Sequence, residues 1–350
     1  MVKNRYDSLN GLRTIMCIGI LVMHVFANTK NGLKGYFFEN IIPSFNSFVF
    51  LFMIISGFGM CCGYYKKIKN NEITLNEFYK KRYKKILPFF ALLVVFDVLI
   101  ERSFSSIIEG FADLTLVYGF LPNPKIQVIG VGWTIGVIFA FYILFPFFVF
   151  LLDNKKRAWF SLSISLIFNF VCLYYFFDDY FVTDSFRASS NILYCSIYFI
   201  IGGIIYLYRE NLKIVKDNKI LYGLCLLISM IIFLIPVDII NLKWFPTIKE
   251  SIVYTLWLII AINTNGKIMN NRFTKFISNI SMEIYLCHMM VFRILEKIKL
   301  INIFDNGILS YTTNCILVLI GAIIFSIITK KIIKKINYYI STKISKFIDI

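Results

Sequence analysis

Long apolar stretches alternate with short polar, basic segments along the whole chain. An α-helix needs about 20 predominantly apolar residues to cross roughly 30 Å of hydrocarbon. Ten stretches approach or reach this length: 12–28, 44–65, 86–101, 133–152, 159–177, 191–208, 220–237, 247–263, 276–295 and 309–329. The pattern therefore predicts an all-α, polytopic membrane protein with about ten transmembrane helices.

The basic residues divide unequally between the two sides of this predicted bundle. Ten spans place both termini on the same side. The segments on that side carry 27 of the 37 Lys and Arg residues, and the segments on the opposite side carry ten. Because cytoplasmic segments are enriched in Lys and Arg, we predict that both termini are cytoplasmic.

Composition supports the membrane interpretation and excludes other classes of protein. The 350 residues are 58% hydrophobic and 16% charged, and the mean hydropathy is +0.73, which excludes a soluble globule and a disordered chain. The net charge of +17 is spread in short clusters between apolar runs, so we expect membrane lipids, and no nucleic acid, as partners. The eight Cys residues lie in apolar stretches without metal-type spacing, and we predict packing roles, no disulfide framework and no metal site.

We interpret residues 1–350 as a single transmembrane domain. The segment 103–131 is too interrupted to span, and its mixed pattern predicts a surface helix or a re-entrant lid. Residues 331–350 form a cytoplasmic basic tail, which is predicted to be an amphipathic helix on the inner leaflet.

The only two histidines, His24 and His288, lie inside predicted spans. Ionisable residues within a membrane are costly and usually mark a functional interior. Each His lies twelve residues from the basic end of its span, counted from Leu12 and Phe276, or about 18 Å deep. We therefore expect the imidazoles at one level. The alternative is that each makes only an interhelical hydrogen bond.

Polar residues continue the same helix faces towards the basic side. Arg13 and His24 are eleven positions apart and lie within about 20° of each other on a helix. Ser281, Tyr285 and His288 follow the i, i+4, i+7 rule. We expect both stripes to line a shared interior, with the two imidazoles bridging a passage between the two aqueous compartments.

A dense basic cluster precedes the third predicted span. The sequence FYKKRYKKILPFF contains Lys80, Lys81, Arg82, Lys84 and Lys85. Arg82 and Lys85 share one helical face, which suits phosphate oxygens because a guanidinium offers a fork of donors and an ammonium a point charge. The alternative is an ordinary cluster that only fixes membrane topology.

An ordered set of motifs resembles those of the membrane acyltransferase-3 family. These are GLRTIMCIGILVMH at 11–24, FLFMIISGF at 50–58, FYKKRYKKILP at 78–88, WTIGVIFAFYILFP at 133–146, FIIGGIIYL at 199–207 and ISMEIYLCH at 280–288. Members are ten-span bacterial proteins that transfer acyl groups, commonly acetyl, from a cytoplasmic donor to extracytoplasmic sugars. The resemblance implies a multi-pass protein of the bacterial inner membrane.

The resemblance also implies roles for individual residues. His24 matches the family's catalytic His, Arg13 matches the Arg of its opening motif, and Arg82 matches the first basic residue of an R-x-x-R-I-L-P element associated with coenzyme A. It implies acyl-CoA, most simply acetyl-CoA, as a co-substrate with no permanently bound cofactor. The acceptor would be a surface or lipid-linked carbohydrate.

Together these arguments give a predicted site for O-acetyl transfer. The expected catalytic residues are His24, as the base that takes the hydroxyl proton, with Arg13 and His288. The expected phosphate contacts are Arg82, Lys85 and Lys81. The expected substrate contacts are Tyr285, Ser281 and Trp133, the last being the residue that opens the fourth motif.

Three positions depart from the family pattern. Asn10 stands where Asp is frequent, and Lys85 replaces the second Arg. Ile138 stands where many members carry Glu. The role of that carboxylate is then absent, unnecessary, or taken by Glu283 or Asp97.

Two other classes of protein share some of these features. Paired histidines on two helices can ligate one haem through both axial positions. A transporter, flippase or polymerase for lipid-linked sugars would also be polytopic with a basic cytoplasmic side, although many transporters contain internal repeats that this sequence lacks.

Overall fold

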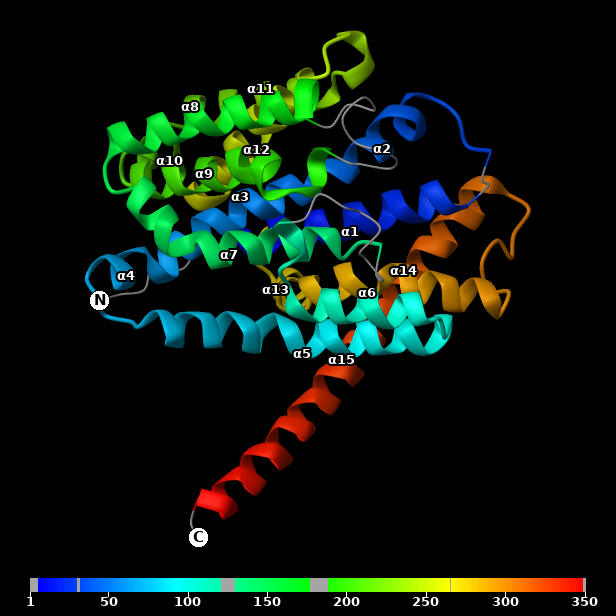
Figure 1. Cartoon of the computed structure of the whole chain (residues 1–350). Helices are drawn as coiled ribbons and strands as arrows, with labels where there is room; N and C mark the ends of the chain where they lie inside the picture. The colour runs from blue at the N-terminus through cyan, green and yellow to red at the C-terminus, as the bar shows by residue number, and fades with distance from the viewer. Residues whose placement is uncertain (1–5, 30–31, 121–129, 177–187, 265, 349–350) are drawn as a thin grey trace.

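The computed structural model describes residues 6–29, 32–120, 130–176, 188–264 and 266–348, and within these ranges the chain is all-helical (Figure 1). The long helices are α1 (Leu9–Asn28), α3 (Phe48–Met60), α5 (Leu75–Glu101), α7 (Trp133–Leu151), α8 (Lys155–Val171), α9 (Ile192–Tyr208), α11 (Lys219–Leu234), α12 (Phe245–Asn263), α14 (Ser281–Lys297) and α15 (Gly307–Ile348). The short helices are α2 (Ile42–Ser44), α4 (Lys66–Lys69), α6 (Phe104–Thr115), α10 (Ile214–Asp217) and α13 (Arg272–Asn279). The predicted all-α class is confirmed, and each of the ten predicted spans falls on one of the long helices.

Within the described residues, six helical segments are long and apolar enough to cross a membrane. They are Leu9–Asn28, Phe37–Lys69, Trp133–Leu151, Lys155–Tyr175, Phe245–Asn263 and Gly307–Tyr339. A bent pair, α9 with residues 211–217, passes the same test as a possible seventh. The structure therefore supports a multi-pass membrane protein, while ten spans and cytoplasmic termini stay predictions.

Helices α3 and α9 form the closest pair in the bundle because glycines lie at their contact. A Cβ atom at Gly202 would lie 2.1 Å from the carbonyl oxygen of Ile54, and one at Gly57 would lie 2.4 Å from that of Phe199. Small residues at such a seam let two backbones touch, which is a common way to pack helices where lipid removes the hydrophobic driving force. This pair fixes α3 at the centre of the molecule.

Helix α1 is held between α13, α14 and α15 by side chains that bond to backbone carbonyls. The hydroxyl of Thr14 donates to the carbonyl of Thr274 at 3.1 Å, and the hydroxyl of Tyr311 donates to that of Val22 at 3.1 Å. The thiol of Cys17 donates to the carbonyl of Ser281 at 3.5 Å. The polar face of α1 is thereby turned towards the polar face of α14.

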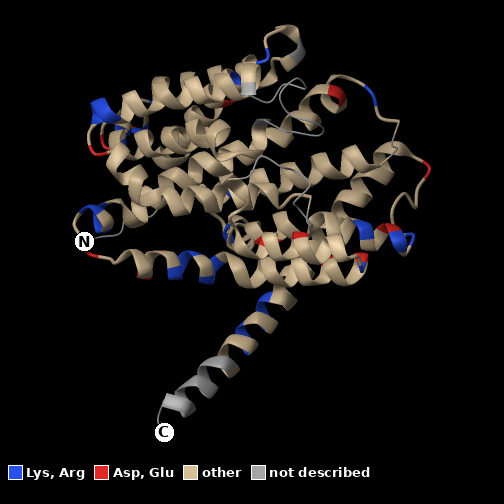
Figure 2. Cartoon of the chain, viewed as in Figure 1, with Lys and Arg blue, Asp and Glu red and all other residues tan. Residues whose placement is uncertain are grey.

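Helix α5 begins at Leu75, ahead of the span predicted from residue 86. A capping box explains the early start, since Thr74 accepts a hydrogen bond from the backbone N–H of Glu77 and the Glu77 carboxylate accepts one from that of Thr74. The basic cluster therefore lies inside a helix, where Figure 2 shows it along the first half of α5.

The segment 103–131 forms the short helix α6, which packs along α5 at Gly110. Its exposed face carries Phe104 and Phe111, consistent with the predicted surface helix. Residues 121–129 lie outside the described residues, so the alternative of a re-entrant lid stays a prediction there.

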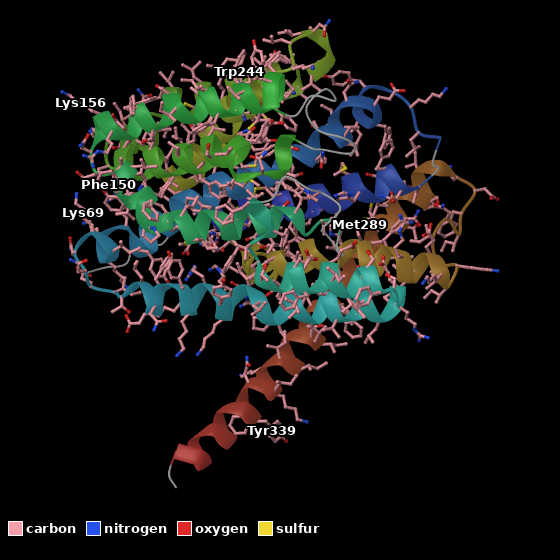
Figure 3. The ribbon with its side chains drawn as sticks, in the orientation of Figure 1. Lys69, Phe150, Lys156, Trp244, Met289 and Tyr339 are labelled. Carbon is pink, nitrogen blue, oxygen red and sulfur yellow. The ribbon has the colours of Figure 1, made fainter. Side chains whose placement is uncertain are left out.

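The C-terminal tail continues α15 without a break after Lys330. Figure 1 shows this part of α15 leaving the bundle, and Tyr339 stands clear of the other helices in Figure 3. The tail is helical, as the sequence predicted. The predicted boundary at residue 331 is not a helix end, because α15 runs through it. Residues 349–350 lie outside the described part.

All eight cysteines are free. Five of them, Cys17, Cys61, Cys172, Cys195 and Cys287, are buried. The packing role predicted for the cysteines applies to these five, and Cys62 is exposed.

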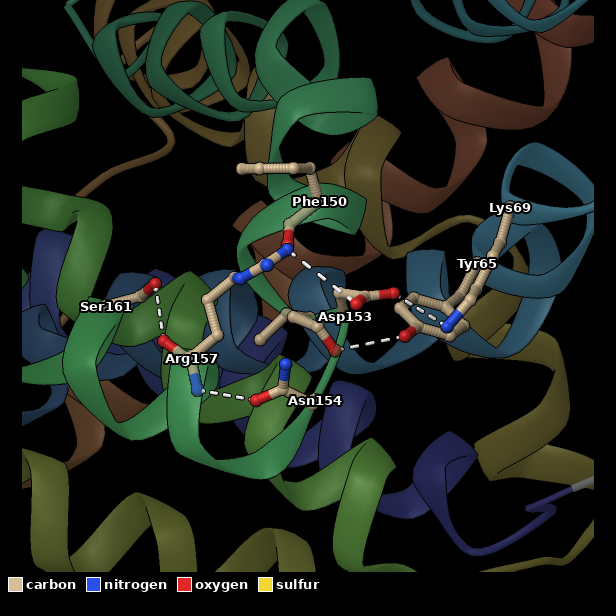
Figure 4. A network of polar contacts seen from close by, with 8 residues as sticks. Tyr65, Lys69, Phe150, Asp153, Asn154, Arg157 and Ser161 are labelled. Carbon is tan, nitrogen blue, oxygen red and sulfur yellow. Dashed lines mark hydrogen bonds and ion pairs between the residues drawn. The ribbon is translucent and has the colours of Figure 1, made fainter.

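A polar network joins the end of α3 and α4 to the turn between α7 and α8 (Figure 4). Lys69 pairs with Asp153 at 2.7 Å, Arg157 approaches the same carboxylate at 3.7 Å, and the Tyr65 hydroxyl donates to the carbonyl of Leu152 at 3.0 Å. The hydrogen bond from Lys69 lowers the pKa of the Asp153 carboxyl. Figure 3 shows Lys69 at the same end of the bundle as Phe150 and Lys156.

Candidate active site

A cavity of about 640 Å³ lies between α1, α3, α5, α7, α14 and α15. Its lining includes four basic residues, Arg13, Arg82, Lys85 and Lys330. Arg13, Arg82 and Lys85 were predicted from sequence, and the fold brings the four residues together from α1, α5 and α15. Lys81, the third predicted phosphate contact, is exposed and lies outside this lining. We call this space the basic cavity.

Arg82 is held in place by aromatic and sulfur groups. One terminal nitrogen donates to the Tyr64 hydroxyl at 2.6 Å, and the other lies 3.5 Å from the sulfur of Met60. The guanidinium carbon lies 4.7 Å from the Tyr64 ring centroid and 5.7 Å from that of Tyr142. Its Nε is buried without a hydrogen-bond partner in the described structure. A stacked guanidinium with an unused donor is oriented for an anionic ligand.

One carboxylate enters the basic cavity. Glu283, whose side chain is 9% exposed, pairs with Lys330 at 2.8 Å, and Lys330 also donates to the carbonyl of Asn279 at 2.8 Å. Ile138 lines the same cavity, but Asp97 does not. Of the two carboxylates suggested as substitutes for the family Glu, only Glu283 is therefore in position to act there.

Ser281 and Tyr285 line the basic cavity as predicted. The Tyr285 hydroxyl donates to the carbonyl of Val131 at 3.1 Å and lies 2.8 Å from the hydroxyl of Thr134. These two bonds fix the ring of Tyr285 against the start of α7. Its position on the cavity wall is therefore set by α7 as well as by α14.

The two histidines meet where α1 packs on α14. Their ring centroids lie 5.1 Å apart with an angle of 45° between the ring planes. His288 is 1% exposed, whereas His24 is half-buried. The prediction of two imidazoles at one level is confirmed.

The contacts of His288 fix which of its nitrogens carries the proton. Nδ1 lies 2.6 Å from the backbone carbonyl oxygen of Tyr285. Because a carbonyl only accepts hydrogen bonds, we assign the proton of the neutral ring to Nδ1, which leaves Nε2 as an acceptor. Nε2 is buried and has no hydrogen-bond partner among the described residues.

Neither imidazole belongs to the lining of the basic cavity. Tyr285 lies between them and that space, with its ring centroid 6.0 Å from that of His288. The sequence predicted a continuous passage past both imidazoles. In the structure the ring of Tyr285, held by its bonds to Thr134 and Val131, separates the basic cavity from the histidines. The stripe of Ser281, Tyr285 and His288 is divided between the cavity and the buried histidine contact.

Trp133, the third predicted substrate contact, lies apart from Ser281 and Tyr285. It lines a second cavity, of about 260 Å³, while the next residue, Thr134, lines the basic cavity. Sequence reasoning missed Thr134 and Tyr64 because their partners are distant in sequence. Lys330 was counted only among the cytoplasmic basic residues, although it is the first cation after the last predicted span.

No curated protein and no solved structure matches the chain significantly. A family model described as an acyltransferase domain matches residues 6–330. The match covers α1 to the part of α15 that reaches Lys330, and so includes both histidines and every residue of the basic cavity. The chain therefore belongs to the acyltransferase-3 family.

Proposed function

We propose that this acyltransferase is a membrane O-acetyltransferase. It would move an acetyl group from cytoplasmic acetyl-CoA to a hydroxyl of a surface or lipid-linked carbohydrate across a bacterial inner membrane. One observation carries the proposal: Tyr285 lies on the wall of a cavity with four cations and also packs against one of two contacting histidines. A site for an anionic donor thus adjoins a pair of bases.

The dimensions of the basic cavity suit a phosphate-anchored thioester. Arg82 stacks near Tyr142 and Tyr285 bonds to Thr134, and these two α7 residues are separated by a rise of about 12 Å. An extended pantetheine arm spans on the order of 15 to 20 Å. With its phosphates on Arg82, Lys85 and Arg13, acetyl-CoA would bring its thioester to the region of Tyr285 and the histidines.

His24 is the proposed general base. It is the more exposed of the two imidazoles, so an acceptor hydroxyl can approach it, and a neutral imidazole suits proton transfer near neutral pH. His288, with its proton on Nδ1, keeps an unpartnered Nε2 beside the His24 ring. An acceptor atom at that place would stabilise the positive charge that His24 gains when it takes the hydroxyl proton.

The transfer then balances without another reactant. As His24 removes the proton, the hydroxyl oxygen forms a bond to the thioester carbonyl carbon. The carbon–sulfur bond breaks, and His24 returns the proton to the leaving thiolate, which regenerates the neutral imidazole. The products are an O-acetyl sugar and free coenzyme A.

The same geometry disfavours a haem protein. Two axial imidazoles must lie on opposite faces of a porphyrin. Ring centroids 5.1 Å apart, with His288 buried against Tyr285, leave no slot for a macrocycle between them.

Substitution of the proposed base tests the function. His24→Ala should lower ester formation from radiolabelled acetyl-CoA by about 100-fold or more, the usual contribution of a general base. Ile15→Ala, an exposed position on the same helix, should keep full activity. Unchanged acetylation by His24→Ala at normal protein levels would discard His24 as the base. A wild-type protein that transfers no acetyl group to extracted surface carbohydrate would discard the function.

A further inference from the structure

The second cavity lies at the opposite end of α3 from the mouth of the basic cavity. Val49 and Phe50, at the start of α3, line it, whereas Gly59 and Met60, at its end, line the basic cavity. Other walls come from Trp133, at the start of α7, and from the first turns of α12. In the predicted topology this end faces away from the cytoplasm, and we call the space the outer cavity.

A carboxylate is the main polar group of the outer cavity. Glu250 lines it and accepts a hydrogen bond from the Tyr198 hydroxyl at 2.8 Å. The neighbouring Lys249 donates instead to the carbonyl of Ile235, and no ion pair reaches Glu250 within the described ranges. Because a carboxyl group can form more hydrogen bonds than the one that Tyr198 donates, Glu250 keeps capacity for hydroxyl groups of a ligand.

Five aromatic residues line the outer cavity, namely Phe50, Trp133, Tyr194, Phe233 and Tyr254, and contacts hold several of them in place. Phe50 stacks on Tyr198 with centroids 4.5 Å apart. Tyr194 shares a hydrogen bond of 3.1 Å with Thr247. Tyr254 bonds through its hydroxyl to Ser47. A rigid aromatic surface with a few oriented polar groups is the usual design of a small-molecule site.

The chemistry of this lining selects a class of ligand. The lining contains one lysine, Lys249, whose ammonium is bonded to the carbonyl of Ile235, so the outer cavity lacks the cluster of cations that would hold the phosphates of the donor coenzyme or of a lipid carrier. A ring that has hydroxyl donors on its edge and C–H groups on its face matches both the carboxylate and the aromatic walls. The volume of about 260 Å³ equals that of about nine water molecules at 30 Å³ each, which is enough for one sugar ring.

We propose that the outer cavity binds one neutral sugar unit of the acceptor, with hydroxyls on Glu250 and a ring face on Trp133 and Phe50. This inference rests on the proposed function, because it assumes a carbohydrate acceptor. Neither histidine lines the outer cavity, so the bound unit is an anchoring unit and the acetylated hydroxyl belongs to another unit of the same acceptor. The acceptor therefore contains at least two sugar units.

The position of α7 supports this arrangement. Trp133 faces the outer cavity, while Thr134 bonds to Tyr285 beside the histidines. A sugar anchored on Trp133 is thus separated from the histidine contact by the first turn of α7. The next unit of the chain would have to pass this turn to reach His24.

A direct binding experiment tests the site without requiring turnover. Saturation-transfer NMR would use the purified full-length protein in detergent with methyl glycosides of neutral hexoses and N-acetylhexosamines. We expect at least one glycoside to bind the wild type and to bind Glu250→Gln at least tenfold more weakly. Coenzyme A binding, measured on the same samples, should stay unchanged. Glu210→Gln, which removes an exposed carboxylate in the loop after α9, is the matched control.

A second variant keeps the result interpretable if Glu250→Gln does not fold. Asn46 lines the outer cavity but is exposed, so Asn46→Ala should fold and weaken the same glycoside several-fold. Absence of glycoside binding to the wild type overturns the inference, and so does equal binding by the wild type and both variants. If glycosides bind through Glu250 but no acetyl group is transferred from acetyl-CoA, the outer cavity is supported as a sugar site and the proposed function fails.

Discussion

The two cavities of this protein share α3 and α7 but have opposite chemistry. The basic cavity is the larger and collects four cations around one carboxylate, while the outer cavity has a carboxylate among aromatic rings and a lysine bonded elsewhere. Trp133 and Thr134, consecutive in sequence, face different spaces. The difference teaches that the same two helices, α3 and α7, can line two cavities of different chemistry, because neighbouring side chains on one helix point into different spaces.

This separation has an electrostatic consequence. The four cations around the basic cavity would favour a polyphosphate there, whereas the outer cavity offers one lysine, which is bonded to the carbonyl of Ile235. Donor and acceptor therefore differ in where they are favoured, and Tyr285 lies between the basic cavity and the histidines. Each of the following substitutions alters the basic cavity, the outer cavity, or the helices that support both of them.

The largest effect is expected from removing the cations of the basic cavity. Arg82→Ala combined with Lys85→Ala should weaken coenzyme A binding by roughly 100-fold or more, because hydrogen bonds to charged groups contribute about 1.5–3 kcal/mol each. Glycoside binding in the outer cavity should not change. Isothermal titration calorimetry measures the affinity for coenzyme A, and saturation-transfer NMR measures glycoside binding.

The chain provides a matched control in the same cluster. Lys80→Ala combined with Lys84→Ala removes the same amount of charge from exposed positions outside the cavity lining. This pair should lower coenzyme A affinity by no more than a few-fold. Equal losses in the two double variants would mean that the cluster acts through general charge, and the comparison between the cavities would lose its basis.

The sequence predicted the parts of this site that depend on local spacing. Arg13 and His24 share a helix face, as do Tyr285 and His288, and these patterns needed only the period of a helix. The cluster around Arg82 could be recognised because five basic residues fall within six consecutive positions. The contact between His24 and His288 could be expected from their equal depth, since the membrane fixes the level of a span.

Other parts depend on packing between distant segments and could not be predicted. The stacking of Arg82 on Tyr64, and the bond from Tyr285 to Thr134, arise from the way α3, α5 and α7 meet. For the same reason the cavity that Trp133 lines could not be predicted. Its type suited a substrate contact, but helical periodicity alone does not say which neighbour a face will meet.

The glycine contact between α3 and α9 can be tested next, because α3 lines both cavities. Gly202→Ala should lower stability by about 1–3 kcal/mol, because the added methyl group would overlap the Ile54 carbonyl and push α3 from α9. Both ligands should bind more weakly, since α3 lines both cavities. Thermal unfolding in detergent measures the stability change.

Gly223→Ala is the matched control for the seam. A Cβ at Gly223 meets nothing within 4 Å, and Ala is the better helix former, so stability should rise slightly or stay constant. A neutral effect of Gly202→Ala would show that the α3 and α9 backbones are not in contact.

A smaller effect is expected from the ion pair inside the basic cavity. Lys330→Gln leaves Glu283 without its partner and should weaken coenzyme A several-fold, because an unpaired carboxylate then faces the phosphates. Adding Glu283→Gln should restore part of the affinity. If the two changes are simply additive in titrations, Glu283 and Lys330 act independently and the pairing has no role in donor binding.

The smallest effect should come from the polar network that joins α4 to the α7–α8 turn, at the end of the bundle away from the outer cavity. Lys69 lowers the pKa of Asp153, so the folded protein gains stability from the charged carboxylate above its ordinary pKa, near ~4. This gain in stability is lost as the pH falls through the lowered pKa that Asp153 has in the folded protein. Asp153→Asn should therefore melt at a slightly lower temperature than the wild type at pH 7, and the difference should be smaller at pH 3. Because both residues are exposed, the shift should be small and should shrink in high salt. A difference that persisted unchanged at pH 3 would place the effect of the substitution in packing or in the turn, and glycoside binding should be unaffected in either case.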